Sequence, residues 1–184
     1  MLGRLLVGLA VVALAAGACG SPPMPSSAPP STVPPVEVSV EESLLEVLPQ
    51  ELEGLPLLPS PEGVEAARTD PAVARDVEAI AGALIAEPGG QFAYATVARL
   101  RPAVMNDEFF RDWRDSFDEA ACEPAGGVAG HAESELGGRP VYIGTCGEGL
   151  RTYHAFVEGR NLLVSISSLG DRRFGERLLE GVDG

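Results

Sequence analysis

The sequence has 184 residues, of which 45% are hydrophobic, a share that is ordinary for a folded protein. It carries 27 acidic side chains against 13 basic ones, all arginine, for a formal net charge of −14. Nucleic acids and anionic lipid headgroups bind through a basic patch that displaces their counterions, so this composition argues against both as partners.

A short apolar run near the amino terminus predicts a cleaved leader. Arg4 supplies one positive charge, and the run 5–18 that follows is apolar throughout. As a helix this run would extend only about 21 Å, whereas the hydrocarbon layer of a bilayer is roughly 30 Å thick. A charged start, a short apolar middle and small residues at the end are typical of a secretory signal peptide, so we predict that 1–18 is a signal peptide.

The end of this run resembles the signal peptides of bacterial lipoproteins. The matching residues are Ala16, Gly17, Ala18 and Cys19, with Ala16 standing where that family usually has leucine. The resemblance implies that a diacylglycerol is joined to the thiol of Cys19 and that cleavage makes Cys19 the first mature residue. More than one acyl chain gives stable attachment, so the expected location is the cell membrane, lipid-anchored on the extracytoplasmic side. Ordinary secretion with Cys19 free, or an uncleaved anchor, are the alternatives.

Prolines and serines dominate the next stretch, 20–35, which cannot build a core. We therefore predict a disordered tether over 19–40, with an extended reach of roughly 60 Å at about 3.1 Å per residue. A proline-rich ligand for a partner domain and a glycosylated stalk are alternative interpretations of the same composition. An acidic stretch follows, with a short helix expected at 41–47.

The remainder, 41–184, is predicted to be a single α+β domain. A short edge strand is expected over 52–63, stopped by prolines. The segment 70–90 is interpreted as a helix, because Asp70 can cap it and Pro71 fits its first turn. Its expected apolar face consists of Val73, Val77, Ile80, Ala81 and Leu84.

A strand over 91–105 and a second helix over 106–121 come next, the helix capped by Asn106. Phe92, Tyr94, Thr96 and Ala98 are expected on one side of the strand. The aromatic residues on one side of the helix are Phe110, Trp113 and Phe117. At helical spacing they are most simply core residues, and the alternative is the wall of an apolar ligand pocket.

The last third is predicted to contain two hairpins and a closing helix. Gly137 and Gly138 indicate one two-residue turn, and 158–161 the other, with Gly159 expected to take a positive φ. The inward positions of the last strand are Leu162, Val164 and Ile166, and those of the helix 170–182 are Phe174, Leu178 and Val182. The order β-α-β-α-β-β-β-β-α predicts an α+β fold, with about three helices packed on a mainly antiparallel sheet.

Once Cys19 is acylated, Cys122 and Cys146 remain as an even pair. Export into an oxidising compartment predicts a disulfide between them. The competing interpretation is a metal site that adds His131 and His154, although its spacings match no familiar zinc pattern.

No nucleophile elbow, metalloprotease helix, phosphate-binding loop or dinucleotide fingerprint occurs, and we predict neither a cofactor nor a metal. His154 with Ser165 or Ser167, and Asp171 nearby, is the most suggestive catalytic arrangement. Solvent-facing polar strand positions explain it more simply, and no catalytic residue is assigned. Two further features, the exposed His131 and the carboxylates Glu133 and Glu135, are interpreted as solvated.

Three functions are therefore expected in decreasing order. The first is a membrane-anchored envelope lipoprotein with a non-catalytic domain that binds a protein partner or acts as an accessory subunit. The second is a carrier or sensor of a small apolar ligand, and the third is an envelope enzyme. An exposed apolar patch would favour the first, an apolar cavity of a few hundred Å³ the second, and a cleft with His154, a serine and a carboxylate the third.

Overall fold

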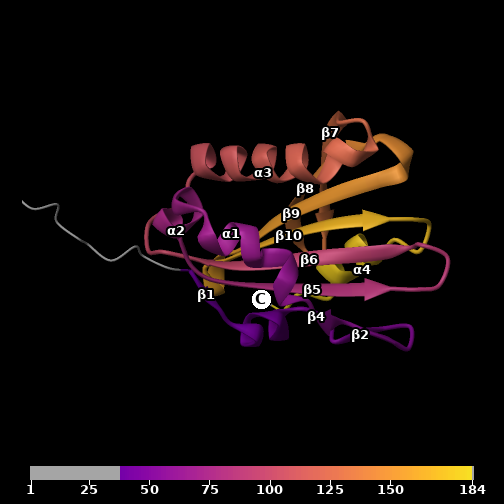
Figure 1. Ribbon diagram of the computed structural model, residues 1–184, viewed down its shortest axis with the longest axis horizontal. Helices are drawn as coiled ribbons and strands as arrows, with labels where there is room; N and C mark the ends of the chain where they lie inside the picture. The colour runs from indigo at the N-terminus through magenta and orange to yellow at the C-terminus, as the bar shows by residue number, and fades with distance from the viewer. Residues whose placement is uncertain (1–37, 184) are drawn as a thin grey trace, which may run out of the picture. The chain divides into compact units, whose positions relative to one another are not determined.

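The computed structural model describes residues 38–183. The expected signal peptide, Cys19 and nearly all of the expected tether lie outside this range. The described chain has the predicted α+β fold, with a mainly antiparallel sheet of eight strands (Figure 1). The order across the sheet is β1-β5-β6-β10-β9-β8-β7, and β4 pairs with β5 beyond β1's short stretch. Within residues 38–183, no helix combines the length and apolarity needed to cross a bilayer.

The strands of this sheet are β1 (Ser39–Val40), β4 (Leu58–Pro59), β5 (Val77–Ala86), β6 (Phe92–Leu100), β7 (Val128–Leu136), β8 (Arg139–Cys146), β9 (Leu150–Val157) and β10 (Leu162–Leu169). A separate small hairpin pairs β2 (Glu51–Leu52) with β3 (Leu55–Pro56). The α-helices are α1 (Glu65–Thr69), α2 (Pro71–Asp76), α3 (Asp107–Cys122) and α4 (Phe174–Glu180). The 3₁₀ turns are η1 (Glu42–Val47), η2 (Pro61–Val64), η3 (Glu123–Ala125), η4 (Gly147–Gly149) and η5 (Glu158–Arg160).

Helical segments cover both faces of the sheet. On one face, α4 and η1 bury their apolar residues against alternate positions of β5, β6, β9 and β10. This core includes the predicted inward residues Leu162, Val164, Ile166, Phe174, Leu178 and Val182. On the other face, α1, α2 and α3 share a second and less completely buried core with Ile80, Ala98 and Leu163 (Figure 1).

The predicted helix 70–90 is wrong over most of its length. Asp70 caps α2 as expected, accepting a hydrogen bond from Ala72 N at 2.7 Å, but α2 ends at Asp76. Residues 77–86 form the strand β5, which pairs with β6 and is covered on both faces. Because both faces are buried, its apolar residues do not alternate with polar ones, and such a run resembles one face of a helix.

Other predicted elements are confirmed. Asn106 caps α3 by accepting a hydrogen bond from Phe109 N at 2.9 Å. Gly137 and Gly138 form the turn between β7 and β8, both with positive φ. At the turn between β9 and β10, however, the positive φ belongs to Asn161 and not to Gly159, since asparagine also tolerates the left-handed region.

The folded body begins earlier than the expected domain boundary at residue 41. Val38 is only 2% exposed, and β1 pairs in parallel with β5 through Ser39 and Val40. These three residues were expected in the tether, but the edge of the sheet extends to them.

Candidate functional site

The largest hollow of the described chain is an open groove of about 880 Å³ beside α3. Its walls come from α1 and α2 on one side and α3 on the other, over β5 and β6. The apolar side chains that line it include Val64, Val73, Ile80, Val104, Phe109, Trp113 and Phe117. This groove is where the second core remains incompletely covered.

Two glycines let Tyr94 close the floor of the groove. A Cβ on Gly63 would lie 2.1 Å from the Tyr94 hydroxyl oxygen, and one on Gly82 would lie 2.2 Å from it. The absence of side chains at both positions therefore allows the phenol of Tyr94, which comes from β6, to fit between η2 and β5. The strand and the turn are held apart by that ring, and the groove lies above it.

The helix α3 presents different residues to the groove and to the neighbouring strands. Phe109, Trp113 and Phe117 line the groove. Phe110 and Asp118 instead face β8 and β9: the Phe110 ring meets the Tyr142 ring edge-on at 5.1 Å, and Asp118 reaches His154. Positions three and four apart share a side of a helix, so two adjacent rows of side chains serve two different surfaces.

Behind the groove lies a chain of buried hydrogen bonds. Trp113 Nε1 donates to Ser165 Oγ at 2.9 Å, and Ser165 Oγ lies 3.0 Å from His154 Nδ1. The opposite ring nitrogen, His154 Nε2, lies 2.8 Å from Asp118 Oδ1. Indole nitrogen can only donate, so the serine proton is directed to Nδ1, and Nε2 carries the proton that is donated to Asp118.

Two further groups complete this chain at the carboxylate. Thr152 Oγ1 donates to Asp118 Oδ1 at 2.5 Å, and His131 Nε2 lies 3.1 Å from Asp118 Oδ2. Gly144 leaves room for the carboxylate, because a Cβ there would come within 2.7 Å of Asp118 Oδ2 and 2.2 Å of Thr152 Oγ1. Each buried polar atom of the chain thereby has a partner, which removes the cost of burying it.

The ionisation of the buried pair follows from its surroundings. Burial lowers the pKa of His154, and this outweighs the opposing effect of the hydrogen bond to Asp118. Burial alone would raise the pKa of Asp118, but hydrogen bonds from His154 and Thr152 outweigh it, so that this pKa is lowered overall. A neutral imidazole next to an ionised carboxylate is the state that the directions of the hydrogen bonds require.

This network contains a serine, a histidine and an aspartate in contact, but it is built as a support. Ser165 and His154 are both 0% exposed, and the Phe117 ring covers His154 edge-on at 5.2 Å. A nucleophile has to reach its substrate. The Ser165 hydroxyl instead accepts from Trp113 and donates to the imidazole, which fixes Trp113 in the wall of the groove.

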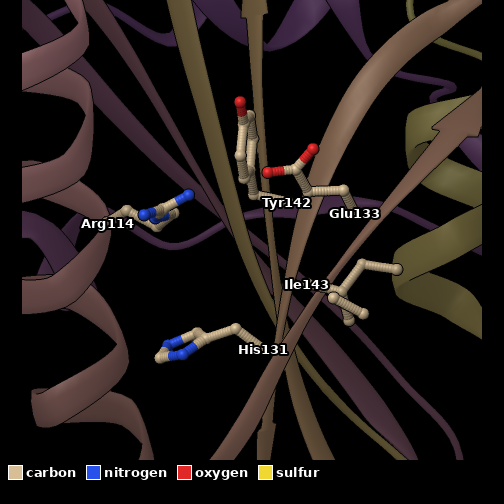
Figure 2. A pocket seen from close by; sticks show the side chains of 6 residues that line it. Arg114, His131, Glu133, Tyr142 and Ile143 are labelled. Atoms are coloured by element: carbon tan, nitrogen blue, oxygen red, sulfur yellow. The ribbon is translucent and has the colours of Figure 1, made fainter.

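A smaller hollow of about 450 Å³ lies on the other side of α3 (Figure 2). Figure 2 shows Arg114 extending from α3 toward the strands, while His131 points from β7 back toward that helix. The Arg114 guanidinium lies over the Tyr142 ring, 4.5 Å from its centroid. Acidic residues surround this one cation, with Asp115 3.7 Å from its Nε and Glu133 in the wall of the hollow, so the hollow offers no net positive charge to an anion.

The expected cysteine pairing is present. Cys122 and Cys146 form a disulfide with a Cα–Cα distance of 5.2 Å, joining the end of α3 to the end of β8. The alternative metal site is not assembled, because the two histidines of that set both contact Asp118 instead. Within residues 38–183, no cluster of three or more histidine, cysteine or acidic side chains is placed to hold a metal.

The structure places the remaining sequence candidates in different ways. Ser165 does contact His154, but Ser167 and Asp171 do not join this contact. Of the three aromatic residues expected as core, Trp113 and Phe117 line the groove. His131 is exposed as expected, with 53% of its side chain accessible, yet it also touches Asp118.

The residue missing from the sequence-based set is Asp118. It is 0% exposed and accepts from three side chains that follow it by 13 to 36 positions. The only signal available in the sequence is an acidic residue on α3 four positions after Arg114 and eight after Phe110, on a side that otherwise faces the sheet. Its partners lie on β7 and β9, which no local pattern relates to α3.

Comparison with protein-family models, with curated proteins and with solved structures gives no match.

Proposed function

We propose that this chain is a lipid-anchored protein of the extracytoplasmic membrane surface whose domain binds a small apolar ligand in the groove beside α3. The observation that carries the ligand-binding part is the groove of about 880 Å³ with its aromatic and aliphatic walls. Ligand sites are typically concave, mostly apolar and between about 300 and 1,000 Å³ in volume. The groove falls within that range and combines apolar walls with a few polar groups, among them Thr96, Asn106 and Ser116.

The rigidity of one wall supports the same proposal. Trp113 is held by Ser165, and Phe117 is held against His154, so both rings are positioned before a ligand arrives. A preformed site loses less conformational freedom on binding than a flexible one, and its affinity is correspondingly higher.

Binding of a protein partner through an apolar surface has less support. The large apolar side chains that are exposed in residues 38–183 are Leu58, Leu84 and Val128. Leu58 and Leu84 are register partners on β4 and β5, whereas Val128 begins β7 at the opposite edge of the sheet. Two neighbouring leucines form a much smaller surface than the groove. The enzyme alternative has no accessible nucleophile to support it, because Ser165 is 0% exposed.

The membrane part of the proposal rests on the sequence. The Ala16–Gly17–Ala18–Cys19 step after a short apolar run supplies the anchor, and the proline-rich stretch after it supplies a spacer. A domain held in this way would meet apolar compounds at the membrane surface, where such compounds are concentrated.

The binding test uses N-phenyl-1-naphthylamine, a neutral apolar fluorophore whose emission rises in apolar surroundings. Trp113 is the single tryptophan of the chain and lines the groove, so excitation of tryptophan reports on a probe bound there by energy transfer. We expect saturable binding with energy transfer from Trp113.

A matched pair of variants locates the probe. Ala67→Leu adds volume inside the groove and should weaken binding by about tenfold, since small changes of volume in an apolar pocket have effects of that size. Ala129→Leu adds the same volume at an exposed position of β7 and should leave binding unchanged. Equal affinities in the two variants, or no energy transfer from Trp113, would contradict ligand binding in the groove.

A further inference from the structure

The charged residues at the groove are almost all acidic. Its lining contains four carboxylates and one arginine: Asp70, Asp76, Glu108, Asp112 and Arg75. The arginine is already used, because Arg75 Nη2 lies 2.6 Å from Asp76 Oδ2 and its Nε donates to the same carboxylate. Three carboxylates therefore remain without a counter-charge in the lining itself.

These three carboxylates lie on both walls. Asp70 stands at the amino-terminal end of α2, and Glu108 and Asp112 lie one turn apart on α3. The nearest cation to Asp112 is Arg111, whose Nε is 3.8 Å from Asp112 Oδ1 with both side chains largely exposed. Such an exposed pair is strongly screened by water and leaves most of the negative field of the groove in place.

The rest of the molecule adds to this field. The chain has a net charge of −14, so nothing in its overall charge offsets the groove. A concave site lined by one sign of charge over apolar walls concentrates counter-ions of the opposite sign. The faces of Phe109, Trp113 and Phe117 offer, in addition, the aromatic surface on which cations bind.

From these observations we infer that the groove selects amphiphiles with a cationic head and an apolar body, and disfavours anionic ones such as fatty acids. This inference rests on the proposed ligand-binding function and narrows its ligand class. The apolar body fills the space between α1–α2 and α3, and the head lies at the acidic rim.

Three dodecyl compounds that differ only in the head test this selectivity below their micelle concentrations: dodecyltrimethylammonium, dodecanol and dodecanoate. Binding is followed by the emission of Trp113. We expect the ammonium compound to bind at least about tenfold more tightly than the carboxylate in dilute buffer, with the alcohol between them. The difference should shrink at about 0.5 M salt, where the Debye length is roughly 4 Å.

Two double variants with the same change in net charge assign the effect to the rim. Glu108→Gln/Asp112→Asn removes two groove carboxylates and should reduce the tenfold preference to about threefold or less. Glu133→Gln/Glu135→Gln removes two exposed carboxylates from β7 and should leave the preference as it is.

The outcomes separate this inference from the function on which it rests. If dodecanol binds and the charged compounds bind equally well, or if dodecanoate binds best, the cationic selectivity is wrong while the apolar groove stands. If the two double variants change the preference equally, the rim carboxylates are not its cause. If none of the three compounds binds, ligand binding in the groove fails, and the selectivity fails with it.

Discussion

Ser165 connects a donor and an acceptor that have no other partner within reach. Its hydroxyl accepts from Trp113 Nε1 and lies 3.0 Å from His154 Nδ1, and its residue is 0% exposed. Replacing Ser165 by alanine leaves a buried imidazole nitrogen and an indole N–H without hydrogen bonds. We expect a loss of about 1–3 kcal/mol in the free energy of unfolding, measured by urea denaturation.

The neighbouring serine of the same strand is the control for this change. Ser167 is only partly buried and lies on β10 two positions further along. Ser167→Ala should alter stability by no more than about 0.5 kcal/mol, the usual effect of a surface substitution. Equal losses in the two variants would contradict the supporting role of Ser165.

The buried histidine predicts a stability that falls with acidification. Because burial lowers the pKa of His154, the unfolded chain binds a proton at a pH where the folded chain does not. Stability should therefore be complete above the ordinary histidine value of about 6.5 and decrease as the pH falls below it toward the folded-state pKa. The charged neighbours of His154 are Asp118, which opposes this shift, and Arg114 and His131, which favour it. Urea denaturation at about pH 7.5 and about pH 5 measures the decrease.

The chain has only two histidines, so one variant separates their contributions. His131→Asn removes the exposed imidazole and should retain the loss of stability between the two pH values, because His154 is its source. If the loss disappears in this variant, the exposed residue and not the buried one is responsible. Asp118, whose pKa is also lowered, adds a second loss that begins near its ordinary value of 3.8 and continues below it.

The helix α3 is the element on which the site depends, and its end is tied to the sheet by a covalent bond. The disulfide joins residues separated by 24 positions, and closing a loop of that size restricts the unfolded chain. Replacing both cysteines by serine should reduce the free energy of unfolding by roughly 3.5 kcal/mol on the chain-entropy estimate. Denaturation of the parent with and without a reducing agent should show a similar difference, and a parent insensitive to reduction would contradict this role.

Local patterns predicted the elements that have one buried side. The helix α3, the hairpin turn at Gly137 and Gly138, and α4 all carry caps, turn residues or apolar residues at regular spacing. The strand β5 lacks such a signal because both of its faces are covered. A run of alanine, valine and isoleucine buried on all sides fits a helix as well as a strand, and only its pairing with β6 decides.

At the candidate site, the sequence named several of the right residues without their arrangement. The cysteine pair, the contact of His154 with Ser165 and the pocket-wall alternative for Trp113 and Phe117 are all found. Asp118 is missed, and Asp171 was considered in its place. Contacts between α3 and β9 depend on how the helix crosses the sheet, and this follows from the packing of the whole domain.

At the scale of the whole molecule, the anchor predicts where the protein is found. Cys19→Ala removes the thiol that the resemblance assigns to acylation, and should move the protein from the membrane fraction to the soluble fraction. Ser26→Ala alters the proline-rich stretch without touching the thiol and should stay with the membranes. Fractionation of the producing cells measures both, and a Cys19 variant that still sediments with membranes would contradict the anchor.

The groove is the feature that unites the two faces of α3, the buried network and the proposed ligand, and its occupation can be observed at one atom. The single tryptophan gives one indole N–H resonance in a ¹H–¹⁵N correlation spectrum, and that N–H belongs to the wall of the groove. On titration with N-phenyl-1-naphthylamine, we expect this resonance to shift and saturate together with the amides of α1 and α3. A bound probe that leaves the indole resonance unmoved, or an absence of binding, would contradict the assignment of the groove as a ligand site.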